Sequence, residues 1–221
     1  MLANLTMPYL ALLWAAMALV GYLLGCMNGA LVISRFFYHD DVRKHGSGNA
    51  GLTNFYRTYG TRYALGVIAV DLLKAAAACA LGGWLLGSPV GEYFMGFFCM
   101  LGHMFPVMYH FKGGKGILCS GMTLIMIDWR VALAGWGFFL LMWLTTKYVS
   151  LGSICAAISF PIMTAVLFRG YVYFPAIMGF STATAVLILW AHRGNIVRLL
   201  QGTERKVTLG KKKTEGEEKK P

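Results

Sequence analysis

The chain has 221 residues, of which 57% are hydrophobic, 14% aromatic and only 13% charged, with a formal net charge of +11. Soluble globular proteins carry about 25% charged residues, so this composition excludes an ordinary soluble domain and predicts an integral membrane protein. Basic residues beside the membrane account for the positive charge. The composition therefore gives no reason to expect a nucleic-acid partner.

Five apolar stretches are long enough to cross a bilayer, because about 20 helical residues span a hydrocarbon core of ~30 Å. These predicted spans cover residues 10–33, 63–86, 92–110, 149–168 and 171–191. The first stretch has no positively charged segment before it and is too long for the apolar region of a signal peptide. We therefore expect it to remain in the protein as a helix.

The region 116–146 is too long for one comfortable span and short for two. A single helix would bury Asp128 and Arg130 in mid-bilayer, at a cost of about 2.5–3.5 kcal/mol each. Two short helices would instead place "DWR" in a tight turn at an interface. We predict the two-helix arrangement, which makes an all-α protein with seven transmembrane helices.

The distribution of basic residues favours the same count and sets the orientation. With seven helices the 34–62 loop, Lys112, Lys115, Lys147 and the lysine-rich tail share one side, opposite Arg130 and Arg169. Six helices would separate Lys147 and the tail from the 34–62 loop, against the positive-inside rule. The prediction is an N-terminus outside and a C-terminus in the cytoplasm. Residues 1–201 form the single membrane domain, and residues 202–221, without apolar periodicity, a disordered tail.

Three polar stretches open onto the predicted cytoplasmic face: "GSGNAGLTNFYR" (46–57), "GHMFPVMYHFKGGKG" (102–116) and "HRGNIVRLLQGTE" (192–204). Irregular polar backbone at the membrane edge is tolerated where it lines a cavity, so we expect one shared site. The first stretch also matches G-x-G-x-x-G, but a long apolar helix precedes it instead of a strand. We therefore reject the dinucleotide-binding interpretation.

The middle stretch has the composition of a phosphate site. Gly113, Gly114 and Gly116 allow backbone N–H groups to form an anion nest at the positive end of the next helix. Lys112 and Lys115 supply charge. The alternative is a flexible turn between helices with two interfacial lysines.

The other two stretches supply hydrogen-bonding groups. Those suited to glycerol-like hydroxyls are Ser47, Asn49, Thr53 and Asn54, and Arg57 can bind a phosphate through two parallel hydrogen bonds. The alternative role of Ser47 or Thr53 is helix capping. His192 and Asn195 share one helix face if the helix continues, although His192 alone could be an interfacial histidine.

Together, "SGNAGLTN" with Arg57, "GHMFP…FKGGKG" and "HRGNIVRLLQGTE" resemble, in order and spacing, the three cytoplasmic motifs of the bacterial acyl-phosphate-dependent glycerol-3-phosphate acyltransferases. The resemblance extends from the first helix to about Glu204. It departs from the family pattern at Leu52, where alanine is common, and in the lysine-rich tail.

The resemblance implies that an acyl group passes from acyl phosphate to the 1-hydroxyl of glycerol 3-phosphate, giving lysophosphatidic acid and phosphate. It also implies a bacterial inner-membrane location, a seven-helix fold with a cytoplasmic active site, contact with membrane lipid, and no cofactor or metal. By the same analogy the catalytic residues are Ser47, Arg57, Lys115, His192 and Asn195. Ser150 and Ser153 of "SLGS" join the substrate-binding residues.

Residue patterns of other chemistries are missing from the sequence. No histidine is followed five positions later by aspartate, as in the soluble H-x-x-x-x-D acyltransferases, and no paired D-x-x-D carboxylates suggest a metal site. The five cysteines, Cys26, Cys79, Cys99, Cys119 and Cys155, are scattered singly through apolar segments. We expect them to act as small core residues.

A transporter for an organic phosphate remains an alternative. Asp71 and Lys74 lie three residues apart inside the second predicted span, and ionisable residues within a membrane often line translocation routes. The favoured interpretation is that they form an ion pair that fixes helix packing. No inverted internal repeat supports transport.

Overall fold

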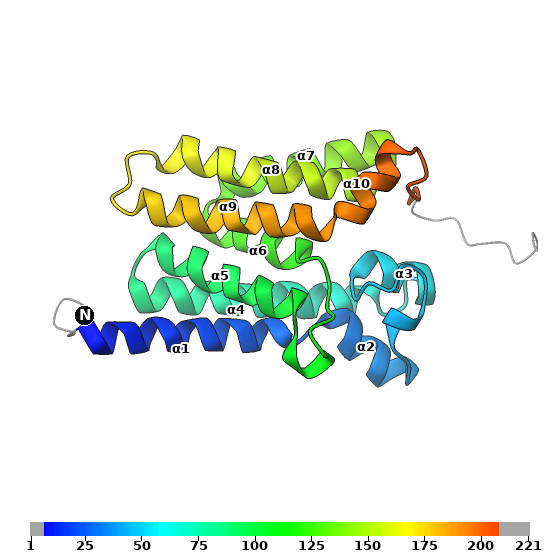
Figure 1. The fold of residues 1–221 in the computed structure, drawn as a ribbon, viewed down its shortest axis with the longest axis horizontal. Helices are drawn as coiled ribbons and strands as arrows, with labels where there is room; N and C mark the ends of the chain where they lie inside the picture. Colours follow the sequence, from blue (N-terminus) through cyan, green and yellow to red (C-terminus); the bar gives the residue numbers. More distant parts are fainter. Residues whose placement is uncertain (1–6, 208–221) are drawn as a thin grey trace, which may run out of the picture.

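The computed structural model describes residues 7–207, and within this range the chain is helical and contains no strand (Figure 1). The α-helices of the described part are α1 (Met7–Cys26), α2 (Gly29–Tyr38), α3 (Leu52–Tyr59), α4 (Ala64–Leu86), α5 (Pro89–Met104), α6 (Ile117–Ile127), α7 (Trp129–Thr146), α8 (Val149–Phe168), α9 (Phe174–Ala191) and α10 (Arg193–Leu200). Two short 3₁₀ helices, η2 (Val42–Lys44) and η3 (Val107–Tyr109), lie in the loops.

The long helices run side by side in two layers (Figure 1). Helices α1, α4 and α5 pack together in one layer, α7, α8 and α9 form the other, and α6 contacts α4, α5 and α7 between them. Within residues 7–207, the stretches long and apolar enough to cross a membrane are Met7–Tyr38, Ala64–Leu86, Val149–Phe168 and Phe174–Ala191. The protein thus has the helical architecture that its composition predicts.

Each predicted span contains a helix, but crossing of the membrane by all seven and the orientation of the termini stay predictions. The predicted division of the region 116–146 is confirmed, because α6 ends at Ile127 and α7 begins at Trp129. Asp128 between them accepts a hydrogen bond from the backbone N–H of Arg130 at 2.8 Å and pairs with the Arg130 guanidinium at 2.7 Å. The side chain that caps α7 is therefore the one that interrupts the apolar run.

The first predicted span, 10–33, lies within the apolar stretch Met7–Tyr38, but it is not one continuous helix. Helix α1 ends at Cys26, and Asn28 caps α2 by accepting a hydrogen bond from the Leu31 N–H at 3.0 Å. The break leaves the carbonyls of Gly25 and Met27 without helical partners, and the Lys74 ammonium donates to both, at 3.0 and 2.9 Å. A buried side chain from another helix therefore stabilises an interruption that hydropathy does not reveal.

The bounds of two other helices also differ from those of the predicted spans. Helix α5 covers Pro89–Met104 instead of 92–110, and α9 begins at Phe174 instead of 171. Helices α4 and α5 approach closely at a pair of glycines, where a Cβ on Gly82 would collide with the carbonyl oxygen of Gly91. Small residues at such crossings are typical of helix packing in membranes.

The start of the predicted tail contacts the bundle. The Val207 N–H donates to the Lys147 carbonyl at 2.9 Å, and the Trp143 indole N–H donates to the Val207 carbonyl at 3.2 Å. These bonds bring residues 203–207 alongside α7 and α8. The rest of the predicted disordered tail, 208–221, lies outside the described residues.

Candidate active site

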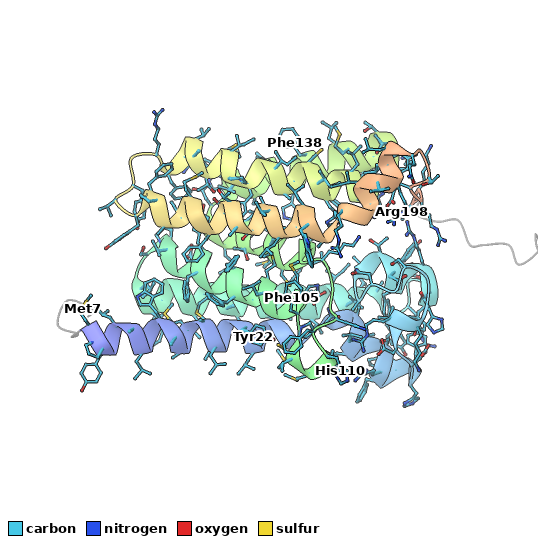
Figure 2. The ribbon with its side chains drawn as sticks, in the orientation of Figure 1. Met7, Tyr22, Phe105, His110, Phe138 and Arg198 are labelled. Atoms are coloured by element: carbon cyan, nitrogen blue, oxygen red, sulfur yellow. The ribbon has the colours of Figure 1, made fainter. Side chains whose placement is uncertain are left out.

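A cavity of about 650 Å³ lies at the end of the bundle that carries α3 and α10, and residues of both helices line it. Figure 2 shows Arg198 at this end and Met7 at the opposite one. All three polar stretches contribute residues to the walls of this cavity. Of the residues predicted from the sequence, those that line it are Ser47, Asn49, Thr53, Asn54, Arg57, Lys115, Gly116, Ser150, Ser153, His192 and Asn195.

One wall of the cavity is a connected set of polar side chains. The Lys115 ammonium donates to the Asn195 side-chain oxygen, and the Asn195 amide donates to Glu204 Oε1 at 2.7 Å. The same carboxylate accepts from the Ser150 hydroxyl at 2.9 Å and from Arg198 at 2.7 Å. Sequence reasoning did not assign a role to Glu204 or Arg198, although an acidic residue within a basic run was the available signal.

The wall carries more positive than negative charge. Burial lowers the pKa of Lys115 to about 8, and the nearby cations Arg198 and Arg57 act in the same direction. Burial also lowers the pKa of Arg57, whose guanidinium donates to the Arg205 carbonyl at 3.1 Å. Burial alone would raise the pKa of Glu204, but hydrogen bonds from Asn195, Arg198 and Ser150 lower it, so Glu204 is a carboxylate. A dianionic phosphate would complete the charge balance of this wall.

His192 joins α9 to α10 and lines the cavity. Its Nδ1 lies 2.8 Å from the Ile188 carbonyl oxygen, so Nδ1 carries the hydrogen and Nε2 the lone pair. Burial and the neighbouring Lys115 charge lower the pKa of His192 to about 4. The imidazole is therefore neutral at pH 7, and its Nε2 accepts hydrogen bonds rather than donating them to phosphate.

Asn54 lines the cavity, but its side chain holds the loop around it. The amide donates to the carbonyls of Val42 and His45, each at 3.0 Å, and its oxygen accepts from the Ser47 N–H at 2.9 Å. Because both amide hydrogens are used, the predicted substrate-binding role of Asn54 does not fit this geometry. Asn54 instead shapes the loop that presents Ser47 and Asn49.

The predicted glycine nest is wrong in its geometry. The N–H groups of Gly113 and Gly114 donate to the carbonyls of Met104 and His103, at 3.0 and 3.1 Å, and neither glycine lines the cavity. Lys112 is exposed and does not line it either. Lys115 and Gly116 of this stretch line the cavity, together with the first turn of α6. An anion in the cavity would thus face the positive end of that helix.

Arg43, which the sequence reasoning missed, joins the first two polar stretches. Its guanidinium is held by Asp41 at 2.6 Å and donates to the carbonyls of Tyr109 and Lys112, both at 2.9 Å. Its position beside Asp41 in a charged run gave no signal for this role.

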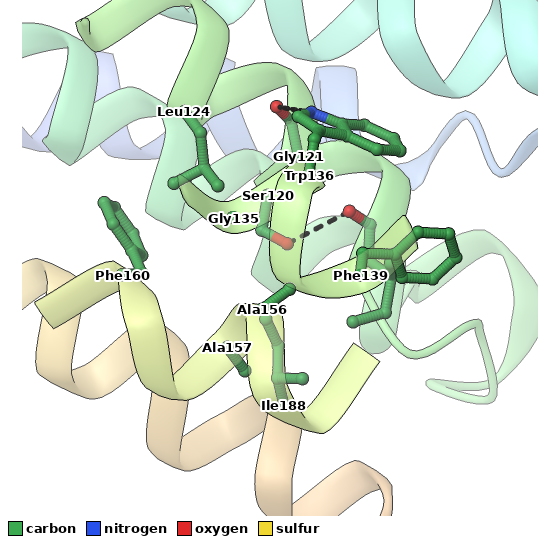
Figure 3. Close-up of a pocket in the computed structure, with 11 residues that line it drawn as sticks. Ser120, Gly121, Leu124, Gly135, Trp136, Phe139, Ala156, Ala157, Phe160 and Ile188 are labelled. Atoms are coloured by element: carbon green, nitrogen blue, oxygen red, sulfur yellow. Dashed lines mark hydrogen bonds between the residues drawn. The ribbon is translucent and has the colours of Figure 1, made fainter. Parts of the chain in front are cut away.

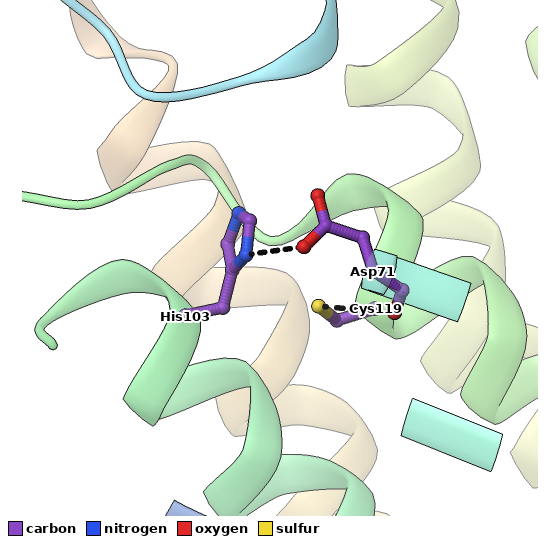
Figure 4. A group of neighbouring side chains, drawn as sticks. All are labelled: Asp71, His103 and Cys119. Carbon is purple, nitrogen blue, oxygen red and sulfur yellow. Dashed lines mark hydrogen bonds and ion pairs between the residues drawn. The ribbon is translucent and has the colours of Figure 1, made fainter. Parts of the chain in front are cut away.

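The floor of the cavity contains Asp71 and His103. The predicted Asp71–Lys74 ion pair is confirmed, with 2.8 Å between Asp71 Oδ1 and Lys74 Nζ. The Lys74 ammonium also lies 3.0 Å from His103 Nδ1. Asp71, His103 and Cys119 place potential metal ligands within 4.8 Å of one another (Figure 4). Because the Lys74 ammonium already contacts two of these ligands, the cluster does not fit a metal ion.

A small apolar pocket adjoins the polar cavity between α6, α7, α8 and α9 (Figure 3). Ile117 and Phe139 line both spaces. The Trp136 indole N–H donates to the Gly121 carbonyl at 3.1 Å, which leaves mainly hydrocarbon facing the pocket. With a volume of about 30 Å³, the pocket has room for only the start of an apolar chain that enters from the polar cavity.

The fold and the cavity are those of an integral membrane protein with a net positively charged cavity at one end of a helical bundle. The family model described as glycerol-3-phosphate acyltransferase matches residues 15–202. Curated glycerol-3-phosphate acyltransferases are similar over nearly the whole chain. The one from Thermoanaerobacter sp. (strain X514) is 37% identical, with 88% of this chain and 95% of the relative covered. The one from Finegoldia magna is 38% identical, with 93% and 100% covered.

Two solved structures share the fold. Both are crystal structures of PlsY (YgiH), described as an integral membrane glycerol 3-phosphate acyltransferase. The glycerol 3-phosphate form gives a TM-score of 0.79 at 33% identity, covering 88% of this chain and 96% of that one. The lysophosphatidic acid form gives 0.76 at 32% identity, with 88% and 95% covered. The chain belongs to the glycerol-3-phosphate acyltransferase family.

Proposed function

We propose that the protein transfers a fatty acyl group from acyl phosphate to the 1-hydroxyl of glycerol 3-phosphate. The products are lysophosphatidic acid and inorganic phosphate, and the reaction is the first step of phospholipid synthesis. The observation that carries this proposal is a polar cavity with a net cationic wall that adjoins an apolar pocket. This combination suits two phosphorylated substrates of which one carries a hydrocarbon chain. The glycerol 3-phosphate form of PlsY supports the choice of acceptor.

The cationic wall binds phosphate in this proposal. Arg57 offers a planar guanidinium and Lys115 an ammonium, and the first turn of α6 adds its dipole. The side chains of Ser47, Asn49 and Thr53 have no hydrogen-bond partners within residues 7–207, so they are available to substrate oxygens. Ser150 and Ser153 at the start of α8 complete the wall nearest the apolar pocket.

The acyl transfer follows from this arrangement. The 1-hydroxyl oxygen of glycerol 3-phosphate attacks the acyl carbonyl carbon, a carbon–oxygen ester bond forms, and the bond from the acyl carbon to the phosphate oxygen breaks. The leaving phosphate keeps that electron pair, and one of its oxygens accepts the hydroxyl proton. Arg57 and Lys115 stabilise the charge on the phosphate as it leaves.

His192 and Asn195 have positioning roles in this reaction. A pKa of about 4 makes His192 a weak base, but its Nε2 lone pair accepts a hydrogen bond from the 1-hydroxyl as it is positioned, before that hydrogen turns to the donor phosphate. Asn195 orients Lys115 through its side-chain oxygen. The donor phosphate is therefore a better proton acceptor than the imidazole.

We also propose that all seven predicted spans cross a bacterial cytoplasmic membrane, with the N-terminus outside. The site then opens to the cytoplasm, where its soluble substrate is made. Single cysteines at exposed positions test the orientation in a Cys155→Ala background, because the other four native cysteines are buried. Lys44→Cys and Leu200→Cys should be labelled from the cytoplasm, and Val172→Cys from outside. Labelling of positions 44 and 200 from opposite sides would refute seven spans.

The activity is tested with purified protein in detergent. Glycerol 3-phosphate is supplied with either acyl phosphate or acyl-CoA, and both phosphate release and lysophosphatidic acid are measured. We expect product with acyl phosphate and an equal amount of released phosphate. Product with acyl-CoA alone would refute the donor assignment. Because detergent leaves no second compartment, product formation would also exclude a purely transporting role.

A further inference from the structure

The floor of the cavity presents one hydrogen-bond donor and one acceptor that the proposed chemistry does not use. His103 is 3% exposed and Asp71 is 1% exposed, yet both line the cavity. Every fully buried side-chain nitrogen and oxygen within residues 7–207 has a hydrogen-bond partner, so the atoms of this pair that lack one are open to the cavity and to the molecule that occupies it.

The donor is a single nitrogen of His103. Nδ1 lies 3.0 Å from the Lys74 ammonium and 3.4 Å from Asp71 Oδ1, the contact drawn as a dashed line in Figure 4. Either Nδ1 accepts a hydrogen bond from Lys74 or a positively charged His103 donates one from Nδ1 to Asp71, and in both cases Nε2 carries a hydrogen. No hydrogen bond from Nε2 to another residue is found within the described range 7–207.

The acceptor is a single oxygen of Asp71. Its Oδ1 accepts from the Gly29 N–H at 3.0 Å and pairs with Lys74 at 2.8 Å. No described residue donates to Oδ2. In Figure 4 the second oxygen of Asp71 and the second nitrogen of His103 point to the same side, away from Cys119.

Surrounding contacts keep these two atoms in place. Lys74 is fixed by the Gly25 and Met27 carbonyls at the break between α1 and α2. Gly114 lies against the His103 ring, since a Cβ there would collide with Nε2. The donor and acceptor are thus preorganised before any substrate enters.

A rigid donor beside a rigid acceptor matches a hydroxyl group, which both donates and accepts. A dianionic phosphate has no hydrogen to donate to Asp71, and the negative carboxylate of Asp71 repels such a phosphate. The reacting hydroxyl has its place beside His192 Nε2 in the proposed reaction, on another wall of the cavity. The remaining hydroxyl of glycerol 3-phosphate is the secondary one.

We infer that Asp71 Oδ2 and His103 Nε2–H bind the secondary hydroxyl of glycerol 3-phosphate and select for a polyol phosphate. This inference rests on the proposed function for the identity of the substrate. Asp71 and His103 are then substrate-contacting positioning residues, and Lys74 contacts Nδ1 on the other side of the histidine ring. A site built to bond a hydroxyl discriminates strongly against an analogue that lacks it, because its buried groups are left unpaired.

The test is equilibrium binding of two ligands by calorimetry, which does not depend on turnover. The ligands are glycerol 3-phosphate and 3-hydroxypropyl phosphate, which lacks only the secondary hydroxyl. We expect the unmodified protein to bind glycerol 3-phosphate about 10–100-fold more tightly. His103→Asn, whose side-chain oxygen can still accept from Lys74 but leaves no donor at Nε2, should reduce this ratio to about threefold or less.

Two further variants separate binding from structure. His103→Gln, which can return an amide N–H near the Nε2 position, should recover most of the ratio. Lys112→Ala, outside the cavity, should leave it unchanged. A ratio near one in the unmodified protein, or an equal loss of affinity for both ligands in His103→Asn, would overturn the inference. Absence of acyl transfer with the binding ratio intact would count against the proposed function alone.

Discussion

Phosphate recognition should weaken at mildly alkaline pH, because Lys115 loses its positive charge there. Burial and two neighbouring arginines lower its pKa to about 8, from an ordinary value of 10.5. The ammonium is then about nine-tenths charged at pH 7, half charged at pH 8 and roughly one-tenth charged at pH 9. If only the charged form binds phosphate, kcat/KM for glycerol 3-phosphate falls about tenfold between pH 7 and pH 9.

The direction follows from the sign of the shift. A lowered lysine pKa means that the folded protein releases this proton more readily, so the cation is lost as pH rises through 8. The kcat/KM profile reports groups of the free enzyme and is the appropriate measurement, from pH 7 to 9.5. Lys115→Arg keeps its charge throughout this range and should remove the fall. The matched variant Lys112→Arg, outside the cavity, should keep it.

Two results would refute this reasoning. The first is a flat profile in the unmodified protein, which would mean that Lys115 is not needed as a cation. The second is an active Lys115→Arg variant in which kcat/KM still falls between pH 7 and pH 9. Another titrating group would then be responsible for the alkaline fall. Loss of all activity in Lys115→Arg would be checked by inorganic phosphate binding over the same pH range.

Three other changes have defined outcomes. Glu204→Gln removes an anion that raises the Lys115 pKa, so the midpoint of the alkaline fall in kcat/KM should move below 8; an upward movement would contradict the charge assignment. Gly114→Ala should lower the free energy of unfolding by about 1–3 kcal/mol, because the added Cβ would collide with His103. The control Gly137→Ala places its Cβ in open space, so its effect on the free energy of unfolding should be neutral or stabilising. Equal effects of the two substitutions in thermal unfolding would refute the packing argument. His192→Gln should keep measurable turnover and the alkaline limb of the unmodified protein, and complete loss of turnover with both substrates still bound would make His192 the base.

The sequence alone determined the class of protein and the ingredients of its site. Apolar length and the rarity of charge predict helices in a bilayer, because an unpaired backbone or an isolated charge is costly there. The cost of burying Asp128 and Arg130 correctly predicted a break between two helices. Residue types together with the family resemblance selected Arg57, Lys115, His192 and Asn195, all of which line the cavity, and their roles stay predictions.

Tertiary structure decided which of these groups face the cavity. Gly113 and Gly114 look like an anion nest in sequence, but their N–H groups are taken by the carbonyls of His103 and Met104, which only folding brings near. Asn54 is likewise occupied by its own loop. Whether a polar group is free for a ligand depends on all of its neighbours, and sequence spacing specifies few of them.

The break between α1 and α2 has the same cause. Met27 and Asn28 lie in a run that hydropathy assigns to one span, and the helix is interrupted because Lys74 from α4 bonds to the carbonyls that the break exposes. The same lysine also lies 3.0 Å from His103 Nδ1 and 2.8 Å from Asp71 Oδ1. Such long-range contacts between α1, α4 and α5 depend on the packing of whole helices, so they become visible only in the assembled bundle.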